Sequence, residues 1–355
     1  MREKTFEPVF DGHNDVLLRL MRKSRPDAER DFLDGDGEGQ LDLPRMLKGG
    51  FAGGIFAIYI PSSEEMDTLD EQMQGESYDV PLSALIESKE ALPVAMAMAA
   101  ILFRIERASK GALKICRNAG DLKDCFKTGT IAAVLHLEGA EPIDRDLNGL
   151  DVLYNAGLRS LGPVWSRPTI FGHGVPFRYP STGDTGPGLT DAGKALIRAC
   201  DDLGIAIDLS HMTEKGFWDI ASISKNPLIA SHSNPHAICP HSRNLSGRQL
   251  DAIKDTGGIV GLNFATCFLN VDGLRNDNTS FELMLRHLDY LIGRLGVDHV
   301  GLGSDFDGAM IPAVIGDVTG LPALQSAMRQ HGYDDALMKK ITHENWINTL
   351  ARCWK

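Results

Sequence analysis

The sequence lacks the features that would place the protein in a membrane or on nucleic acid. No apolar run approaches the roughly 20 residues that span a bilayer. The opening stretch, MREKTFEPVFDGHNDV, contains no apolar core of a signal peptide. A basic excess is also missing, because 36 Lys and Arg stand against 48 Asp and Glu, for a net charge of −12, whereas nucleic-acid binding needs a basic face. We therefore expect a cytoplasmic protein with no membrane anchor and no nucleic-acid partner.

Common cofactor and disulfide signatures are missing as well. The six cysteines occur without a CxxC pair, which predicts buried or free thiols rather than disulfides. No strand-like run is followed by a GxGxxG turn, and the Gly- and Pro-containing stretch 173–190 has no phosphate-loop Lys-Ser/Thr. The acidic stretch 30–40 lacks the spacing of a calcium-binding EF-hand. These absences disfavour a nucleotide-binding fold and a calcium loop.

What the sequence does contain is an alternation of short apolar runs with amphipathic stretches. The eight apolar runs are EPVFDGHND, GGIFAIYI, GTIAAVLHLEG, RSLGPVW, GIAIDLSH, PLIASHS, GGIVGLNFA and DHVGLGSDFDG. Their alternation with helical patterns predicts an α/β fold, a (β/α)8 TIM-like barrel with its active site at the C-terminal ends of the strands. We expect one domain over 1–355, with a helical segment at about 321–355 packed over the barrel. A doubly wound open sheet is the alternative architecture.

Polar residues of a restricted kind follow these apolar runs. His13 and Asp15 lie two residues apart, so on a strand both side chains point to the same face. The other residues at the ends of the runs are Glu138, His211, His232 and Asp305. Because the C-terminal ends of all eight strands meet at one face of a barrel, we expect these residues to be neighbours in space.

Three imidazoles and three carboxylates without a thiolate form a ligand set for Zn²⁺, and the set would also accept Mn²⁺, Co²⁺ or Ni²⁺. The set is large enough for two ions that share one carboxylate. Each residue also has an ordinary interpretation, such as a core histidine, a His–Asp hydrogen bond at a strand end, or a turn at Asp305. Their joint occurrence at strand ends favours the metal site.

The motifs DGHND, HLEGAE, DLSHMT, IASHSNPHAICPHSRN and GLGSDFDG, in this order, resemble those of the membrane (renal) dipeptidase family of zinc peptidases. The likeness runs from about Pro8 to beyond Gly308 and implies a barrel of the amidohydrolase type. It also implies a soluble, bacterial-type dipeptidase with two Zn²⁺ that hydrolyses small dipeptides, including L-Xaa–D-Xaa, by metal-activated hydroxide. Barrels of this type often form homodimers, although the sequence shows no interface.

The resemblance also implies a role for each matching residue. His13 and Asp15 would bind one zinc, Glu138 would bridge, and His211 and His232 would bind the second zinc. Asp305 matches the catalytic acid beside the bridging water. Arg243, in HSRN, matches the arginine that holds the C-terminal carboxylate of the substrate.

One position departs from the family pattern. Animal members carry a substrate-contacting His after the fourth strand, where this chain has Trp165 in the stretch RSLGPVWSRP. The nearby His173 could fold back into that role or be an ordinary loop histidine. Two alternatives to a dipeptidase therefore stay open. One is another amidohydrolase-type barrel acting on N-acyl amino acids or lactams, although many of those begin with His-x-His. The other is a non-catalytic, metal-binding peptide sensor.

Overall fold

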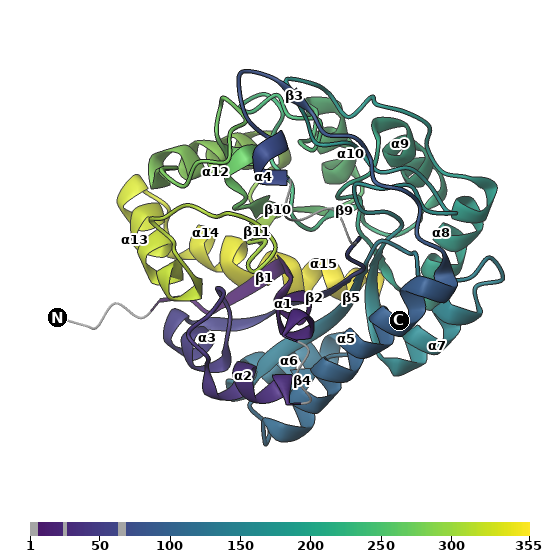
Figure 1. Cartoon of the computed structure of the whole chain (residues 1–355). Helices are drawn as coiled ribbons and strands as arrows, with labels where there is room; N and C mark the ends of the chain where they lie inside the picture. The colour runs from purple at the N-terminus through teal and green to yellow at the C-terminus, as the bar shows by residue number, and fades with distance from the viewer. Residues whose placement is uncertain (1–5, 24–26, 63–68) are drawn as a thin grey trace.

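The structure is a computed structural model that describes residues 6–23, 27–62 and 69–355. Its centre is a ring of parallel strands surrounded by helices (Figure 1). The order around the ring is β8-β6-β5-β2-β1-β11-β10-β9, and a parallel bridge between Asp208 and Ile229 joins its two ends. These strands are β1 (Val9–Asn14), β2 (Phe51–Tyr59), β5 (Ile131–Glu138), β6 (Leu158–Gly162), β8 (Ala206–Ile207), β9 (Ile229–Ala230), β10 (Ile259–Asn263) and β11 (Val300–Gly303). The closed order confirms the predicted barrel, and the open sheet is wrong.

Most of the helices lie outside the strands, and those from α7 to α13 follow one another around the ring (Figure 1). The longer ones are α1 (Val16–Arg22), α2 (Ala28–Asp34), α3 (Leu43–Gly49), α5 (Ser88–Ala108), α6 (Ala119–Thr128), α7 (Asn148–Ala156), α8 (Asp191–Leu203), α9 (Glu214–Ile223), α10 (Gly247–Asp255), α12 (Phe281–Leu295), α13 (Leu321–His331) and α15 (Asn345–Cys353). Shorter pieces are α4 (Leu69–Gln72), α11 (Thr266–Leu269), α14 (Asp335–Lys339), the 3₁₀ turn η1 (Val318–Gly320) and the π-helical turn η2 (Lys340–Glu344).

The ends of α8 and α10 follow from local sequence chemistry. Thr190 caps α8 by accepting a hydrogen bond from the Gly193 amide at 3.1 Å, and the helix ends at Gly204, which adopts a left-handed φ of 73°. Ser246 caps α10 in a reciprocal capping box with Gln249. Each cap satisfies backbone groups that a helix end would otherwise leave unpaired.

Three short strands go beyond the predicted pattern. β4 (Leu113–Ile115) pairs with the first three residues of β5, whereas β6 pairs with the C-terminal half of β5. β3 (Tyr78–Asp79) and β7 (Arg178–Tyr179) form a separate antiparallel pair. Both sets are only two or three residues long, too short for a periodic signal in the sequence.

The C-terminal segment fills one end of the barrel. Trp346, on α15, is fully buried in a cluster with residues of six strands, which include Phe10, Ile55 and Ile259. A Cβ atom at Gly12 or Gly301 would collide with its ring, so glycine at these strand positions makes room for the indole. The indole nitrogen donates to the Leu302 carbonyl at 2.9 Å. Trp346 therefore ties the tail to β1, β10 and β11.

Truncating Trp346 to Ala should lower the free energy of unfolding by about 3–5 kcal/mol, because it leaves a large cavity that the surrounding strands cannot close. The measurement is denaturant unfolding of the wild type and the variant. Trp218→Ala is the control, since Trp218 lies half-buried on α9 and should cost less. Equal losses at the two positions would contradict a central role for Trp346.

Candidate metal centre

The structure places the six predicted strand-end residues around one point at the C-terminal ends of the strands. His13 lies in β1 and Asp15 follows it, while Asn14 between them turns away and donates to the Ile55 carbonyl on β2 at 3.1 Å. Glu138 is the last residue of β5. The remaining three, which follow β8, β9 and β11, are His211, His232 and Asp305. All six are buried.

Glu138 lies between two sets of potential ligands. Its Oε1 is 3.1 Å from His211 Nε2 and 3.4 Å from His232 Nε2. Its Oε2 is 3.6 Å from His13 Nε2, which is itself 3.3 Å from Asp15 Oδ2. In each set the ligand atoms lie within 4.8 Å of one another. The chain thus contains a metal-binding site of His, Glu and Asp side chains, with one carboxylate common to both sets.

Two features of these residues fit bound cations. Both ring nitrogens of His13 are buried without a hydrogen-bond partner among the described residues, and such atoms are costly unless they are satisfied by another ligand. Burial raises the pKa of Glu138 to about 7 and also raises the pKa of Asp305. A cation beside these carboxylates would stabilise their charged forms.

The histidines have different proton affinities. Burial by itself would lower the pKa of His13, but attraction to Glu138 and Asp15 outweighs it, and the pKa is raised. The pKa values of His211 and His232 are lowered well below the usual value, first by burial and then by nearby positive charge. These two imidazoles are therefore neutral at pH 7, as metal binding requires.

Hydrogen bonds on the far side of the rings orient His211 and His232. His211 Nδ1 lies 2.8 Å from Ser166 Oγ, and His232 Nδ1 lies 2.7 Å from Ser231 Oγ. Ser231 Oγ donates in turn to Asp208, a buried carboxylate. Both rings thus direct Nε2 toward Glu138. Asp208 also belongs to a third possible ligand group with His13 and His232, but its oxygens already accept from Ser231 and Ser210, so we assign it to orienting His232.

Replacing Asp208 with Asn should weaken metal binding by about 10–100-fold. The single Asn oxygen would be taken by the amides of Ser210 and Ser231, so its NH₂ group would face Ser231 Oγ and the Ser231–His232 chain would lose its acceptor. Titrating metal into the metal-free protein and comparing the dissociation constants measures this. Asp201→Asn is the control, since Asp201 accepts hydrogen bonds from Ser224 and Asn226 outside the site. An unchanged metal affinity in Asp208→Asn would rule out the orienting role.

Asp305 is held in a strained loop beside these ligands. It adopts a left-handed φ of 61°, and His211 does so too, at 68°, a conformation that costs energy for non-glycine residues and clusters at functional sites. Asn263 Nδ2 donates to Asp305 Oδ2 at 3.0 Å. A Cβ atom at Gly308 would collide with the carboxylates of Asp15 and Asp305, so the G of SDFDG permits this close approach.

A cavity of about 210 Å³ opens onto this group. Asp15, Glu138, His211 and Asp305 line one part of it. Further lining residues are mainly aromatic or apolar: Leu18, Tyr59, Met73, Trp165, Phe177, Ala265, Cys267, Phe268, Ala309 and Met310. The ring centroid of Trp165 lies 5.7 Å from that of His211 and 5.0 Å from that of Tyr59. Trp165 therefore forms cavity wall next to a predicted metal ligand.

The other two predicted substrate-binding residues differ in position. Arg243 is buried behind His232, with Nη2 donating to the His232 carbonyl at 3.0 Å and Nη1 donating to Ser233 Oγ at 2.8 Å. Its guanidinium also lies 5.7 Å from the centre of the Phe268 ring in the cavity wall. His173 is not brought to the cavity, because its Nδ1 faces the Gly188 carbonyl at 3.3 Å.

Sequence reasoning missed several residues of the site. Asn263, which binds Asp305, ends an apolar strand and gives no signal beyond its polarity. Arg275 and Phe268 reach the cavity from the segment after β10, which has no motif. Ser231 and Asp208 are the first residues of the motifs SHS and DLSH, so the polar neighbours of the predicted ligands His232 and His211 were the available signal.

Comparison with known proteins gives the same family as the motifs. The membrane dipeptidase family, peptidase family M19, matches residues 4–353. A protein of Klebsiella pneumoniae, described as an uncharacterized protein in the pqqA 5′ region, is 46% identical over 72% of this chain and 94% of its own length. The dipeptidase tcpJ of Claviceps purpurea is 27% identical over 96% of this chain and 76% of its own length.

Solved structures agree with this result. A metallopeptidase of Rhodobacter sphaeroides, solved with a phosphinate mimic of the dipeptide L-Ala-D-Ala, is 55% identical with a TM-score of 0.97, over 99% of this chain and 100% of that one. Dipeptidase AC, a metallopeptidase of family M19, is also 55% identical, with a TM-score of 0.96 over 99% of both chains. The chain belongs to the membrane dipeptidase family of metallopeptidases, and it is a dipeptidase of that family.

The family is named for a membrane, so we looked for a helix that could span one. Within the described ranges, no helix combines the length and the apolar character needed to cross a bilayer.

Proposed function

We propose that this protein is a binuclear zinc dipeptidase in which Glu138 bridges the two ions. His13 and Asp15 complete one ligand set, and His211 and His232 complete the other. The observation that carries the proposal is the position of Glu138, whose two carboxylate oxygens face different groups of ligands at 3.1–3.6 Å. A carboxylate that served one ion alone would not need both oxygens directed this way.

The residues around the ions would perform the proton transfers. Bound zinc would supply an acidified water and a Lewis acid for the scissile carbonyl. Asp305 would accept the proton of the attacking water and would return it to the leaving amine. The hydrogen bond from Asn263 fixes Asp305 Oδ2, which leaves Oδ1, on the side of Gly308 and the cavity, for proton transfer.

Arg243 and Trp165 would position the substrate. Two of the five N–H groups of Arg243 are used by Ser233 and His232, and Nε has no partner among the described residues, so donors remain for the C-terminal carboxylate. Trp165, at the position where the resemblance places the family histidine, offers an apolar face to the cavity. A small cavity with a carboxylate anchor favours dipeptides. The phosphinate bound by the Rhodobacter relative supports L-Xaa–D-Xaa substrates among them.

Hydrolysis of L-Ala–L-Ala, L-Ala–D-Ala and N-acetyl-L-alanine with zinc supplied, together with metal analysis, tests the proposal. We expect two zinc ions per chain and faster turnover of the dipeptides. Arg243→Ala should raise KM by about 10–100-fold through the loss of charge-assisted hydrogen bonds, and Arg198→Ala, at an exposed arginine of α8, is the control. Two bound ions without dipeptide turnover would instead favour an N-acyl amino acid or lactam hydrolase, or a peptide sensor.

A further inference from the structure

Asp11 is the first residue of the DGHND motif, and none of the roles proposed above uses it. It lies in β1, two residues before His13, and only 2% of its surface is exposed. Its Oδ1 accepts a hydrogen bond from the Ser304 amide at 2.6 Å, and its Oδ2 accepts one from the Ser304 hydroxyl at 2.9 Å. Ser304 directly precedes Asp305. Asp11 therefore holds the neighbour of the proposed proton acceptor by two hydrogen bonds.

These two bonds lie where the backbone pairing between β1 and β11 is interrupted. The two strands pair at Asp11 and Leu302, and a bridge between Asn14 and Phe306 joins the chain segments again further on. Ser304 lies between these two points and is buried, so its amide needs a partner. The Asp11 carboxylate takes the place that a backbone carbonyl has elsewhere in the ladder.

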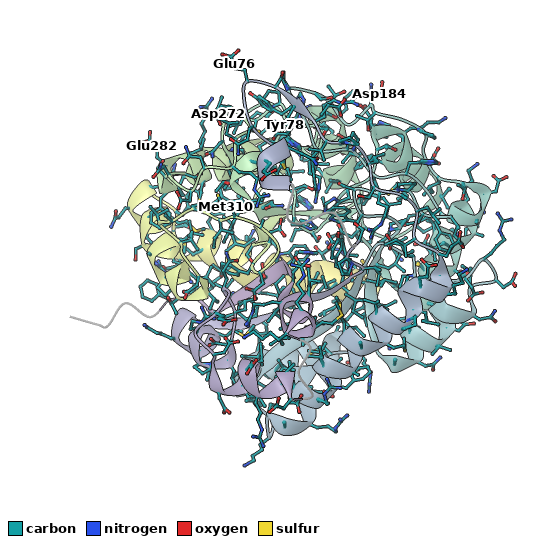
Figure 2. The ribbon with its side chains drawn as sticks, in the orientation of Figure 1. Glu76, Tyr78, Asp184, Asp272, Glu282 and Met310 are labelled. Carbon is teal, nitrogen blue, oxygen red and sulfur yellow. The ribbon has the colours of Figure 1, made fainter. Side chains whose placement is uncertain are left out.

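The loop after Ser304 is also held further along. The Asp305 amide donates to the His13 carbonyl at 3.1 Å. At the outer end of the loop, Met310, labelled in Figure 2, accepts a hydrogen bond from the Thr266 amide at 2.9 Å through its carbonyl oxygen. The loop is thus attached on both sides of the Asp305 side chain, and the attachment at Ser304 depends on Asp11.

Asp305 needs such attachment because its backbone is strained. Its left-handed φ of 61° is a conformation that a non-glycine residue keeps only where its surroundings enforce it. The backbone conformation sets the direction in which the carboxylate leaves the chain, so a relaxed loop would displace Oδ1 from the metal ligands. A displacement of about 1 Å in a reacting group can cost about 100-fold in rate.

We propose that Asp11 is a positioning residue, which holds Asp305 in its left-handed conformation through Ser304 and so aims the Asp305 carboxylate at the attacking water. This inference rests on the proposed function, in which Asp305 transfers the proton. In the part of the chain that the structure describes, Asp11 belongs neither to the cavity lining nor to a possible metal-ligand group. It therefore acts on the reaction through the loop.

The test measures kcat, KM and metal content of Asp11→Ala and Asp11→Asn, with zinc and L-Ala–L-Ala. Ala removes both acceptors, so we expect kcat to fall about 10–100-fold, with KM within about threefold and the metal content unchanged. Asn keeps an oxygen for the Ser304 amide, and its NH₂ group can donate to Ser304 Oγ, whose proton can turn to the His13 carbonyl at 3.2 Å. Asp11→Asn should therefore recover most of the lost kcat.

A double variant shows whether the effect passes through Asp305. In the Asp305→Asn background, Asp11→Ala should lower kcat by less than about threefold, because residues that act as a unit do not have additive effects. Asp201→Ala is the matched control, since Asp201 also accepts one serine hydroxyl, of Ser224, and one backbone amide, of Lys225, both at 2.9 Å. It lies on α8, outside the site, and its replacement should lower stability and leave kcat within about threefold.

If Asp11→Ala does not fold, Ser304→Ala takes its place. It removes the hydroxyl and keeps the amide, so we expect kcat to fall about 3–10-fold, the effect of one hydrogen bond. An unchanged kcat in this variant would then overturn the positioning role.

The outcomes separate the two proposals. An unchanged kcat in Asp11→Ala, a loss of metal from it, or the same loss of kcat with and without Asp305→Asn would overturn the positioning role of Asp11 and leave the dipeptidase proposal intact. A wild-type kcat in Asp305→Asn would overturn the proposed role of Asp305, and the role of Asp11 with it. Wild-type protein that does not hydrolyse the dipeptide would overturn both.

Discussion

Replacing Asp305 with Asn should lower kcat by about 10²–10⁴-fold while the bound metal is retained. The two side chains have nearly the same shape, and the oxygen of Asn can still accept the hydrogen bond that Asn263 donates to Asp305. An amide cannot take the proton of the attacking water, so the loss falls on the chemical step. Steady-state kinetics on a dipeptide and metal analysis of the same samples measure the two quantities.

Asp307→Asn is the matched control for this experiment. Asp307 lies in the same loop and also has a left-handed φ, 66°, but its carboxylate binds Arg19 Nε at 3.2 Å and the Gln40 amide at 2.6 Å. Its replacement should reduce stability and leave kcat within about tenfold, since Asp307 does not line the cavity. A similar fall in kcat for both variants, or loss of metal from Asp305→Asn, would contradict a proton-transfer role for Asp305.

Replacing Glu138 with Gln should remove most of the bound metal and lower kcat/KM by more than about 100-fold, beyond the range for an outer residue that only orients a ligand. Gln keeps one side-chain oxygen, which can serve one ligand set. Its NH₂ group would face the other set, which would lose a ligand oxygen and gain a hydrogen-bond donor that cannot bind a cation. Because both sets contain Glu138, we expect the metal content to fall at both. Elemental analysis after gel filtration and the kinetics of the same preparation test this.

Glu141→Gln separates a metal defect from a folding defect. Glu141 follows Glu138 by three residues, but its carboxylate pairs with buried Arg167 at 2.9 Å. Breaking a buried ion pair is expected to cost about 3–5 kcal/mol of stability, whereas the folded fraction should still bind metal. Retention of two ions by Glu138→Gln would show that Glu138 does not bridge.

The fold follows largely from sequence patterns, with exceptions that have physical causes. Apolar runs between helical stretches predicted the eight strands of the barrel. Two of the strands, β8 and β9, have only two residues each. They stop early because the Asp208 side chain accepts the amides of Ser210 and Ser231, at 3.0 and 2.8 Å, just beyond the strand ends. A side chain that replaces the backbone partner of a strand leaves no mark in hydrophobic periodicity.

The sequence by itself determined which residues are the candidates for the metal ligands and the catalytic acid. Imidazoles and carboxylates stood at the ends of strands, and the direction of a parallel barrel brings those ends together whatever their separation in the chain. The tertiary structure decided what depends on distances between segments that are remote in the sequence. It placed Glu138 between two ligand sets, brought Asn263 into a hydrogen bond with Asp305, and put Arg275 in the cavity wall. The same holds for His173, which its loop turns toward Gly188. Periodicity and strand direction are local properties, whereas the path of a loop is set by packing against distant segments, and no single stretch of sequence contains it.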